Sequence, residues 1–472
     1  MSDRPMFRWA TTSARMLAGT LVSAAAVLAV VTAISVPWPT LTRVPVSISA
    51  APAPAASVVV CDGPLLSIGR DVTDVEGISV AATQSLTSGV SDGSVQAEEQ
   101  ILEMDGIPTG AGPVVFTAPP EDRARVDVAA AGAATARADD LYGFAASACR
   151  PPLLESWLVG GSGETGAADL VLMSNPGVVP ATVDLTVFGA GGPQTPPGGS
   201  GLVVPPGAQR VVPLAGLVLG EVSPVVRVSA AGAPVHASLQ ASITRTLTPG
   251  GVDQVGAVPE PQRMLTITGV AVTRSPGSVG ASDAATVLRL LAPSSDTTAV
   301  VTVTAVGRDV PAREPERVPL VAGQPVGVDL GGLTVGSYTV RIEADEPIVA
   351  AVWQATGFDA GEDFAWYTPS PSVSVPSLFA APAGPPPVLT LVNPGDEPAE
   401  VSVTSDNGAF SLELVVPANG SMAARLSPRL VYILDPGDSE IRAGLSLTGS
   451  GALAGIPVWP ADAAAPAITV YP

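Results

Sequence analysis

The pattern of apolar and polar positions repeats three times along the chain. Residues 170–187 contain an apolar run, a proline-containing turn and a second run, and the same order returns at 287–304 and 388–404. The second run alternates between apolar and polar residues, as in the Val-Thr-Val-Thr of 301–304, which is the pattern of a strand with one buried face. The three copies therefore predict a row of similar β modules.

The turns inside the copies support this interpretation. Asn175-Pro-Gly and Asn393-Pro-Gly match, and the middle copy has Ala292-Pro-Ser in their place. Proline fixes φ and glycine tolerates positive φ, so these sequences favour tight turns. The turn prolines stand at positions 176, 293 and 394, so successive copies are 117 and 101 residues apart. That length accommodates about six or seven short strands.

We therefore expect an all-β fold, in which tandem immunoglobulin- or fibronectin-like β-sandwich modules follow a single N-terminal transmembrane helix. The predicted β-sandwich repeats cover 156–262, 263–370 and 371–472. Aromatic residues are only 4% of the chain, so the tryptophans of these repeats are expected to anchor their cores. These tryptophans are Trp157, Trp353, Trp366 and Trp459.

An N-terminal β module is predicted at 57–155. Strands are expected from Ser57, at 114–116 and at 125–128, and residues 94–104 are expected to form a short helix or an irregular excursion. The two cysteines of the chain, Cys61 and Cys149, both lie here. An even cysteine count outside the cytoplasm favours a disulfide between them, and two reduced thiols are the alternative.

The apolar segment Met16–Val36 contains no charged residue, and as a helix it would span roughly 32 Å, about the thickness of a bilayer core. Arg4, Arg8 and Arg15 precede it, which predicts a cytoplasmic N-terminus and an extracellular remainder. The chain would then have a cytoplasmic tail at 1–15, a transmembrane helix at 16–36 and a Pro/Ala linker at 37–56. A cleaved signal peptide is the alternative, but no small-residue cleavage site directly follows the apolar run.

The composition narrows the function. The net charge of −21 disfavours nucleic acid as a partner. Gly and Pro number 49 each, which suits short strands joined by turns. One histidine and two cysteines leave little material for metal sites or histidine-based catalysis. We assign no catalytic, cofactor-binding or metal-binding residue, and we expect the protein not to be an enzyme.

Several groups of residues are of types that can catalyse reactions or bind metal ions. His236 is interpreted as a structural histidine on a strand at a module surface, and a Cys–His catalytic pair is disfavoured because His236 and the cysteines belong to different modules. Paired carboxylates could serve a glycosidase if they faced each other across a cleft. The chain has four acidic clusters, at 98–99, 139–140, 359–363 and 435–440. The clusters at 359–363 and 435–440 could instead bind Ca²⁺. Solvated turns are the simpler interpretation of all four.

Three segments carry a resemblance to a known family: the segment from Leu141 through Cys149 to Pro152, the Ser156-Trp-Leu-Val-Gly-Gly segment, and the Asn175-Pro-Gly turn. Together with Cys61-Asp-Gly-Pro, they resemble an uncharacterised actinobacterial family of membrane-anchored envelope proteins, catalogued only as a domain of unknown function. The resemblance covers most of 57–472. It implies a surface location and β repeats, and no known activity, ligand or catalytic residue.

These features favour a membrane-anchored extracytoplasmic protein with a structural or binding role in the bacterial cell envelope. Its partner would be an envelope polysaccharide or an envelope protein. One alternative is an accessory scaffold for a membrane complex that processes envelope glycans. A hydrolase acting on glycans is a further alternative.

Overall fold

The computed structural model describes residues 6–35, 48–50, 54–70, 77–91, 93, 95–107, 110–122, 124–274, 285–461 and 468–470. The chain divides into two units, 1–52 with 467–472, and 53–466. The all-β class and the N-terminal apolar helix are confirmed: almost all regular structure in the described part of unit 53–466 is strand.

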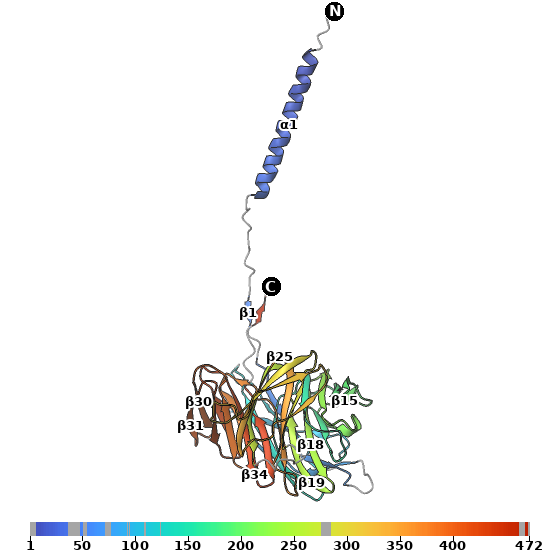
Figure 1. The fold of residues 1–472 in the computed structure, drawn as a ribbon, viewed down its shortest axis with the longest axis vertical. Helices are drawn as coiled ribbons and strands as arrows, with labels where there is room; N and C mark the ends of the chain where they lie inside the picture. The colour runs from blue at the N-terminus through green and yellow to red at the C-terminus, as the bar shows by residue number, and fades with distance from the viewer. Residues whose placement is uncertain are drawn as a thin grey trace, which may run out of the picture. The chain divides into compact units, whose positions relative to one another are not determined.

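The first unit contains helix α1 (Met6–Ser35). Its segment Ser13–Ser35 is long and apolar enough to cross a membrane; a signal sequence near an N-terminus would have the same properties. Strand β1 (Ile48–Ala50) pairs antiparallel with β36 (Ile468–Val470), so a segment of the predicted linker pairs with a segment near the C-terminus (Figure 1). The rest of the predicted linker up to residue 53 lies outside the described residues.

Each of the three predicted repeats forms a sandwich of two four-stranded antiparallel sheets, counted over the described residues. If the strands of a repeat are numbered 1 to 8 along the chain, one sheet has the order 1-6-3-4 and the other has the order 8-7-2-5. In the first repeat the eight strands are β11 (Glu155–Val159), β12 (Leu170–Asn175), β13 (Ala181–Gly189), β15 (Leu202–Val204), β16 (Ala208–Pro213), β17 (Val225–Ala231), β18 (His236–Arg245) and β19 (Thr248–Gly256).

The second and third repeats have the same pairings. In the second, one long strand supplies both positions 6 and 7: β20 (Gln262–Val272), β21 (Thr286–Leu291), β22 (Thr297–Ala305), β23 (Glu316–Leu320), β24 (Val326–Asp329), β25 (Gly336–Ala355) and β26 (Phe364–Tyr367). The third has β28 (Ser377–Ala381), β29 (Pro387–Val392), β30 (Ala399–Ser405), β31 (Ser411–Val416), β32 (Ser421–Arg425), β33 (Leu430–Asp435), β34 (Ile441–Gly449) and β35 (Ala452–Pro457). The short strands β14 (Gly192–Gln194) and β27 (Ser372–Val373) extend two of these sheets.

The strand order bears on the expected family of sandwich. In the immunoglobulin constant arrangement the first strand shares a sheet with the second and fifth, and the seventh shares a sheet with the third and sixth. Here the pairings 2–5 and 3–6 are kept, but the first strand lies beside the sixth and the seventh beside the second. The immunoglobulin- or fibronectin-like detail therefore stays a prediction that rests on the central strands.

The repeated turn has the same hydrogen bonds in two copies. The side-chain amide of Asn175 donates to the carbonyls of Val179 (2.8 Å) and Val204 (3.0 Å), and its oxygen accepts from Gly177 N. Asn393 makes the equivalent bonds to residues 397, 416 and 395. The side chain thus ties the turn to strand 4 of its own sandwich, which explains why the Asn-Pro-Gly sequence marks the repeat.

The N-terminal module is built from β2 (Ser57–Val60), β3 (Leu65–Ile68), β4 (Ile78–Ala82), β5 (Ser85–Val90), β6 (Glu98–Ile101), β7 (Glu103–Met104), β8 (Val114–Ala118), β9 (Val128–Arg137) and β10 (Tyr142–Ala148). The expectation of a helix or irregular segment at 94–104 was wrong for the residues described there. Strand β6 pairs with β8, and β7 pairs in parallel with β16 of the first repeat. Pairing with distant partners overrides the weak local pattern of this polar segment.

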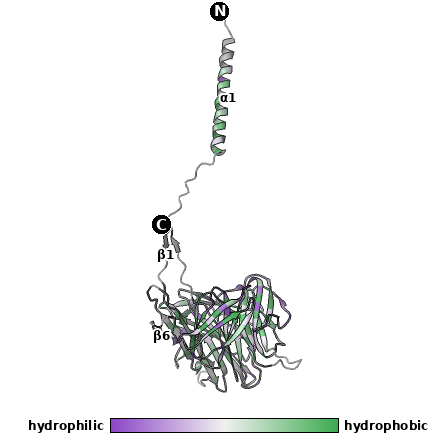
Figure 2. Ribbon diagram, turned by 90° about the vertical axis from the view of Figure 1, so that its left-hand side faces the viewer, coloured by the Kyte–Doolittle hydropathy of each residue, from purple (hydrophilic) through white to green (hydrophobic). Residues whose placement is uncertain are grey.

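The repeats do not extend as a row. The last strand of each repeat, β19, β26 and β35, lies beside the last strand of a neighbouring repeat, and β10 lies between β19 and β35. These four inner strands form a closed ring of neighbours, so the N-terminal module occupies the place of a fourth repeat. Hydrophobic residues lie along the strands of the body (Figure 2). The predicted module boundaries remain predictions, because 53–466 packs as one unit.

Candidate functional site

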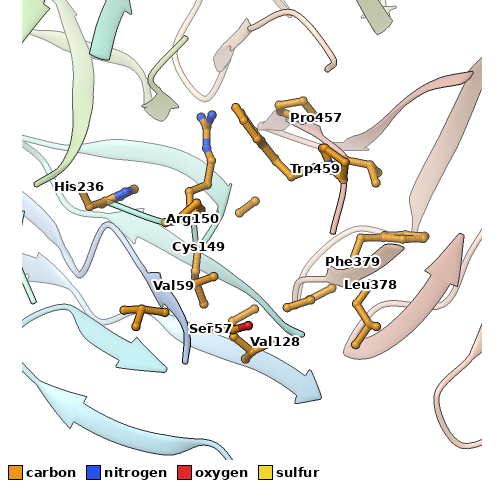
Figure 3. A pocket seen from close by; sticks show the side chains of 18 of the residues that line it. Ser57, Val59, Val128, Cys149, Arg150, His236, Leu378, Phe379, Pro457 and Trp459 are labelled. Carbon is orange, nitrogen blue, oxygen red and sulfur yellow. The ribbon is translucent and has the colours of Figure 1, made fainter. Parts of the chain in front are cut away.

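A cleft of about 250 Å³ lies where the N-terminal module meets the first and third repeats. One part of its wall is apolar, with Val59, Val128 and Phe379 (Figure 3). Another part carries Arg150 and His236. The cleft therefore combines an apolar lining with a few polar groups, which is the usual character of a small-molecule site.

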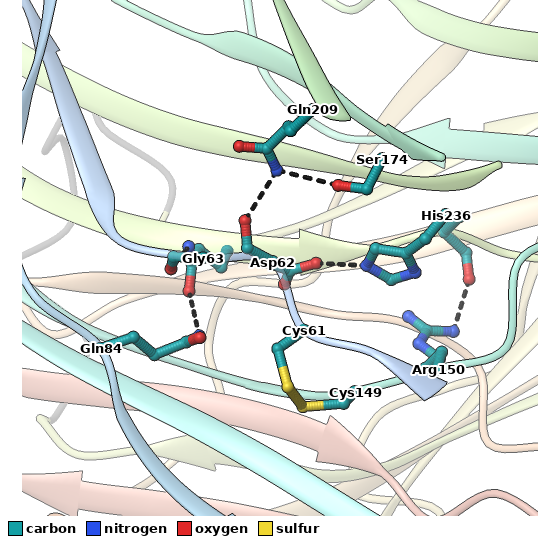
Figure 4. Close-up of polar contacts among 11 residues, drawn as sticks. Cys61, Asp62, Gly63, Gln84, Cys149, Arg150, Ser174, Gln209 and His236 are labelled. Atoms are coloured by element: carbon teal, nitrogen blue, oxygen red, sulfur yellow. Dashed lines mark hydrogen bonds and ion pairs between the residues drawn. A yellow bond between two sulfur atoms is a disulfide. The ribbon is translucent and has the colours of Figure 1, made fainter. Parts of the chain in front are cut away.

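A buried histidine–aspartate hydrogen bond lies behind the polar wall. The His236 Nε2–H donates to Asp62 Oδ1 at 2.7 Å (Figure 4), and these side chains are only 4% and 1% exposed. Burial raises the pKa of Asp62, but the hydrogen bond and charge of His236, together with the nearby hydroxyls of Ser147 and Ser238, outweigh it, so the pKa lies below its ordinary value. The pair joins the end of β2 to the start of β18.

The chain around Asp62 is fixed from both sides. Cys61 forms a disulfide with Cys149. Gln209 of β16 donates from Nε2 to the Asp62 carbonyl (3.0 Å) and to Ser174 Oγ (3.1 Å) (Figure 4). The disulfide and these bonds hold Asp62 within reach of His236, since a buried charge needs a partner fixed in place.

Arg150 follows Cys149 directly and is 7% exposed. Its Nη1 donates to the Ala257 carbonyl at 2.6 Å, and its guanidinium lies 4.5 Å from the centre of the Trp459 ring. Burial lowers the pKa of Arg150 to about 10, partly offset by the charge of Asp62, so it stays protonated at neutral pH. The indole Nε1 of Trp459 and the hydroxyl of Ser57 are buried polar atoms that make no hydrogen bond with the described residues.

A second arginine-on-tryptophan pair lies between the first and second repeats. Arg289, 6% exposed, lies 4.7 Å from the Trp366 ring and donates to the carbonyls of Gly161 (2.8 Å), Pro224 (2.8 Å) and Val222 (3.4 Å). A pocket of about 280 Å³ adjoins it. Here three of the guanidinium N–H donors bind carbonyl groups of the protein's own backbone.

Asp169 accompanies this second pair. Its carboxylate accepts from Ser162 N (2.6 Å) and Ser242 N (2.8 Å). Burial raises its pKa to about 6, against these two hydrogen bonds and the positive charge of Arg289. The carboxylate thus ties the glycine-rich segment 160–166 to β18, and Gly161 of that segment accepts a hydrogen bond from Arg289.

One carboxylate lies where the four inner strands meet. Asp363, fully buried, accepts from Phe144 N of β10 (2.9 Å), Val252 N of β19 (3.2 Å) and Leu453 N of β35 (3.2 Å), and from its neighbour Phe364 N of β26. Burial raises its pKa to about 8 despite these hydrogen bonds. A single side chain therefore connects all four parts of the body.

Two glycines make this convergence possible. Gly143 (φ +143°) and Gly251 (φ +122°) precede the first two donors, and a Cβ atom on either would lie 2.6 or 2.8 Å from Asp363 Oδ1. Asp253, next to Val252, accepts a hydrogen bond from the backbone N–H of Trp366 at 2.7 Å, and burial raises the pKa of Asp253 well above its ordinary value. The ring thus depends on backbone approaches that larger residues would block.

The acidic clusters have different surroundings. Glu98 and Glu99 are exposed on β6. Asp140 pairs with Arg70 at 2.6 Å, which lowers the pKa of Asp140, and Asp435 accepts from Gly437 N in a turn. The cluster 359–363 divides, because Glu362 pairs with Arg274 while Asp363 enters the core. Within the described ranges, no three His, Cys, Asp or Glu side chains are grouped to hold a metal ion.

The expectations for single residues had mixed outcomes. The Cys61–Cys149 disulfide is present. His236 lies on a strand, as expected, but it is buried against a neighbouring module, and the cleft is lined by both His236 and Cys149. The separation assumed from module membership was therefore wrong. Trp157 and Trp366 lie in one core and Trp353 packs against it, whereas half-buried Trp459 lines the cleft.

Sequence reasoning missed the buried charges Asp62, Arg150, Arg289 and Asp363. The adjacency of Asp62 and Arg150 to the two cysteines was a usable signal, because the disulfide brings them close together. Asp363 closes an acidic loop that resembles a solvated turn. Nothing in its local sequence distinguishes it from the exposed Asp359.

The fold and the site define an all-β protein of packed sandwiches, preceded by one apolar helix that fits a single-pass membrane protein. Residues 106–426 match the family described as Family of unknown function (DUF5719). The match covers more than half of the chain, so the protein belongs to that family. No curated protein matches the chain.

Proposed function

We propose that this protein is anchored in the membrane by helix α1, exposes residues 53–466 outside the cytoplasm, and holds a partner of the cell envelope without catalysing a reaction. The observation that carries the proposal is the Cys61–Cys149 disulfide in a body that follows an apolar N-terminal helix. Disulfides persist in oxidising compartments and are rare in the cytosol.

Two further observations support the proposal. Arg4, Arg8 and Arg15 precede the apolar segment, which favours a cytoplasmic N-terminus. The buried carboxylates Asp62 and Asp363 are engaged in joining strands from different modules. Groups with these structural roles suit a body that presents a stable surface.

The location is tested with two C-terminal fusions in the native cell. Alkaline phosphatase gains its disulfides and activity only outside the cytoplasm, and a standard green fluorescent protein exported through the general secretory pathway does not fluoresce there. The proposal predicts an active phosphatase fusion and a dark fluorescent fusion. The reverse pattern would contradict it. The mass of the purified membrane protein decides between anchor and signal peptide, because an anchor leaves residues 1–35 attached.

The partner is tested by incubating the full chain in lipid nanodiscs with isolated cell wall, and by crosslinking in intact membranes. Retention on the wall indicates an envelope polysaccharide, and a specific crosslink indicates an envelope protein or a glycan-processing complex. If the chain is neither retained on the wall nor crosslinked to a specific partner, the binding role is contradicted. For the complex, replacing 13–35 with an unrelated transmembrane helix should abolish the crosslink.

A further inference from the structure

The cleft at Arg150 differs in charge from the rest of the chain. The charged and ionisable residues of its wall are Arg125, Asp127, Arg150 and His236, and the chain as a whole carries −21. Arg125 and Asp127 pair with each other at 3.2 Å. Asp62, the anionic partner of His236 and Arg150, is not part of the wall. Arg150 is therefore a positive charge of the wall that has no anionic partner within the wall, which favours an anion in the cavity.

The hydrogen-bond donors of this wall are incompletely used. Arg150 makes one hydrogen bond to the described residues, through Nη1, although a guanidinium carries five N–H donors. The Trp459 Nε1–H makes none. A buried donor without a partner is costly, so an acceptor bound beside the Trp459 indole N–H would be favourable, and Arg150 lies against the same ring with donors left over.

The remainder of the wall is apolar, and it ends at one further polar atom. Val59, Val128 and Phe379 lie away from Arg150 in Figure 3, with Ser57 among them. The Ser57 residue is 3% exposed, and its hydroxyl also makes no hydrogen bond with the described residues. A volume of about 250 Å³ admits a short hydrocarbon chain but no sugar polymer or folded domain.

We propose that this cleft binds a small apolar molecule that ends in a carboxylate, with the carboxylate at Arg150 and the Trp459 indole N–H and the hydrocarbon against Val128 and Phe379. Arginine and an indole N–H both donate to carboxylate oxygens, and the arginine contact is charge-assisted. Such a group occurs on a short fatty acid and on the C-terminus of an apolar peptide. The proposal concerns this cleft alone and does not depend on the envelope location.

The test uses the full chain in lipid nanodiscs, titrated by calorimetry with hexanoate and with N-acetyl-leucine, the two sources of the carboxylate. Hexanamide and N-acetyl-leucinamide are the neutral controls, and empty nanodiscs give the background. We expect at least one acid to bind and its amide to bind at least about tenfold more weakly, because the amide loses the charge-assisted bond. Equal binding of acid and amide, or no binding of either acid, would overturn the proposal.

Two variants assign the binding to the cleft. Trp459→Phe keeps an aromatic ring beneath Arg150 and removes the N–H, so affinity for the acid should fall roughly three- to tenfold. Trp366→Phe, at the other arginine–tryptophan pair, is the matched control and should leave the affinity unchanged. Circular dichroism confirms that both variants are folded. If Trp366→Phe weakens binding as much as Trp459→Phe, the cleft is not the site.

Discussion

At two joints of the first repeat, its backbone carbonyls accept hydrogen bonds from a neighbouring arginine that lies over a tryptophan. At the joint with the second repeat, Arg289 donates to three backbone carbonyls. At the joint with the N-terminal module and the third repeat, Arg150 donates to one, and the tryptophan beneath it has an unpaired N–H. Both arginines line a pocket, but Arg289 binds three backbone carbonyls whereas Arg150 binds one, so more of the Arg150 donors are left for a ligand.

The difference shows that residue type alone does not define a site. Both arginines are buried, and burial lowers the pKa of both to about 10. What separates them is the number of acceptors that the surrounding backbone supplies. A buried guanidinium with three carbonyl partners stabilises a joint, and one with spare donors beside a cavity can take a ligand.

The largest expected effect comes from the disulfide, which belongs to the cleft side only. Replacing Cys61 and Cys149 together by serine should lower the free energy of unfolding by about 4 kcal/mol, because the bond closes a loop with a sequence separation of 88. Urea unfolding measures the loss. Hydrogen exchange should rise at 57–62 and 147–150 and stay unchanged at 286–291. Faster exchange at 286–291 as well would show that the two joints are not independent.

Replacing each arginine by methionine compares the two joints directly. Arg289→Met leaves three carbonyls without a donor, two of them in buried hydrogen bonds, and should cost about 2–3 kcal/mol, while Arg150→Met leaves one buried carbonyl and should cost about 1 kcal/mol. Urea unfolding of the two variants measures both values. Equal losses would mean that the unused donors of Arg150 are not a real difference.

The pH dependence should also separate the joints. Burial raises the pKa of Asp169, beside Arg289, to about 6, so the folded state holds a proton that the unfolded chain releases above about 4. The contribution of Asp169 to stability is therefore full below about pH 4 and falls as pH rises to about 6, by at most ~3 kcal/mol. Asp62 at the cleft has a lowered pKa, so its contribution is lost only as pH falls below about 4.

Unfolding free energies at pH 4, 5, 6 and 7 test whether the contribution of Asp169 to stability falls as pH rises. Asp169→Asn removes the titrating group, so the fall in stability between pH 4 and 6 should be smaller in the variant than in the natural chain. Asp359→Asn, at an exposed carboxylate of the neighbouring repeat, should leave the slope unchanged. An unchanged slope in Asp169→Asn would refute the raised pKa.

The smallest effect concerns the tryptophans. Trp366 is buried in the core of the first sandwich, and Trp459 is half-buried. Trp366→Phe should therefore cost about 1–2 kcal/mol, and Trp459→Phe at most ~0.5 kcal/mol, as expected for a side chain that retains most of its ring contacts. Thermal unfolding of the two variants measures which of them loses more stability. A larger loss in Trp459→Phe would assign its indole a structural role.

Much of the fold could be predicted from sequence, because alternation and turn residues act locally. The three copies at 170–187, 287–304 and 388–404 each became strands 2 and 3 of a sandwich. The Asn-Pro-Gly turns owe their recurrence to bonds made within four residues and to the adjacent strand. The apolar helix follows from its length and lack of charge.

The arrangement of the repeats could not be predicted in this way. Asp363 and Phe144 are far apart in sequence, and their hydrogen bond depends on how whole modules pack. The same holds for His236 and Asp62, where a lone histidine on a strand gave no sign of its partner. Local patterns specify elements; contacts between modules depend on surfaces formed only after those elements exist.

The Asp363 side chain unites the four inner strands into one body, because it accepts hydrogen bonds from residues of β10, β19, β26 and β35. Hydrogen exchange of the Asp363→Asn variant above pH 8, where the natural side chain is a carboxylate, tests this role most directly, because the amide keeps the size of the side chain but replaces one acceptor oxygen by a donor. The account predicts faster exchange at Phe144, Val252 and Leu453 together, three amides from three distant parts of the chain. Faster exchange confined to residues 356–367 would contradict it.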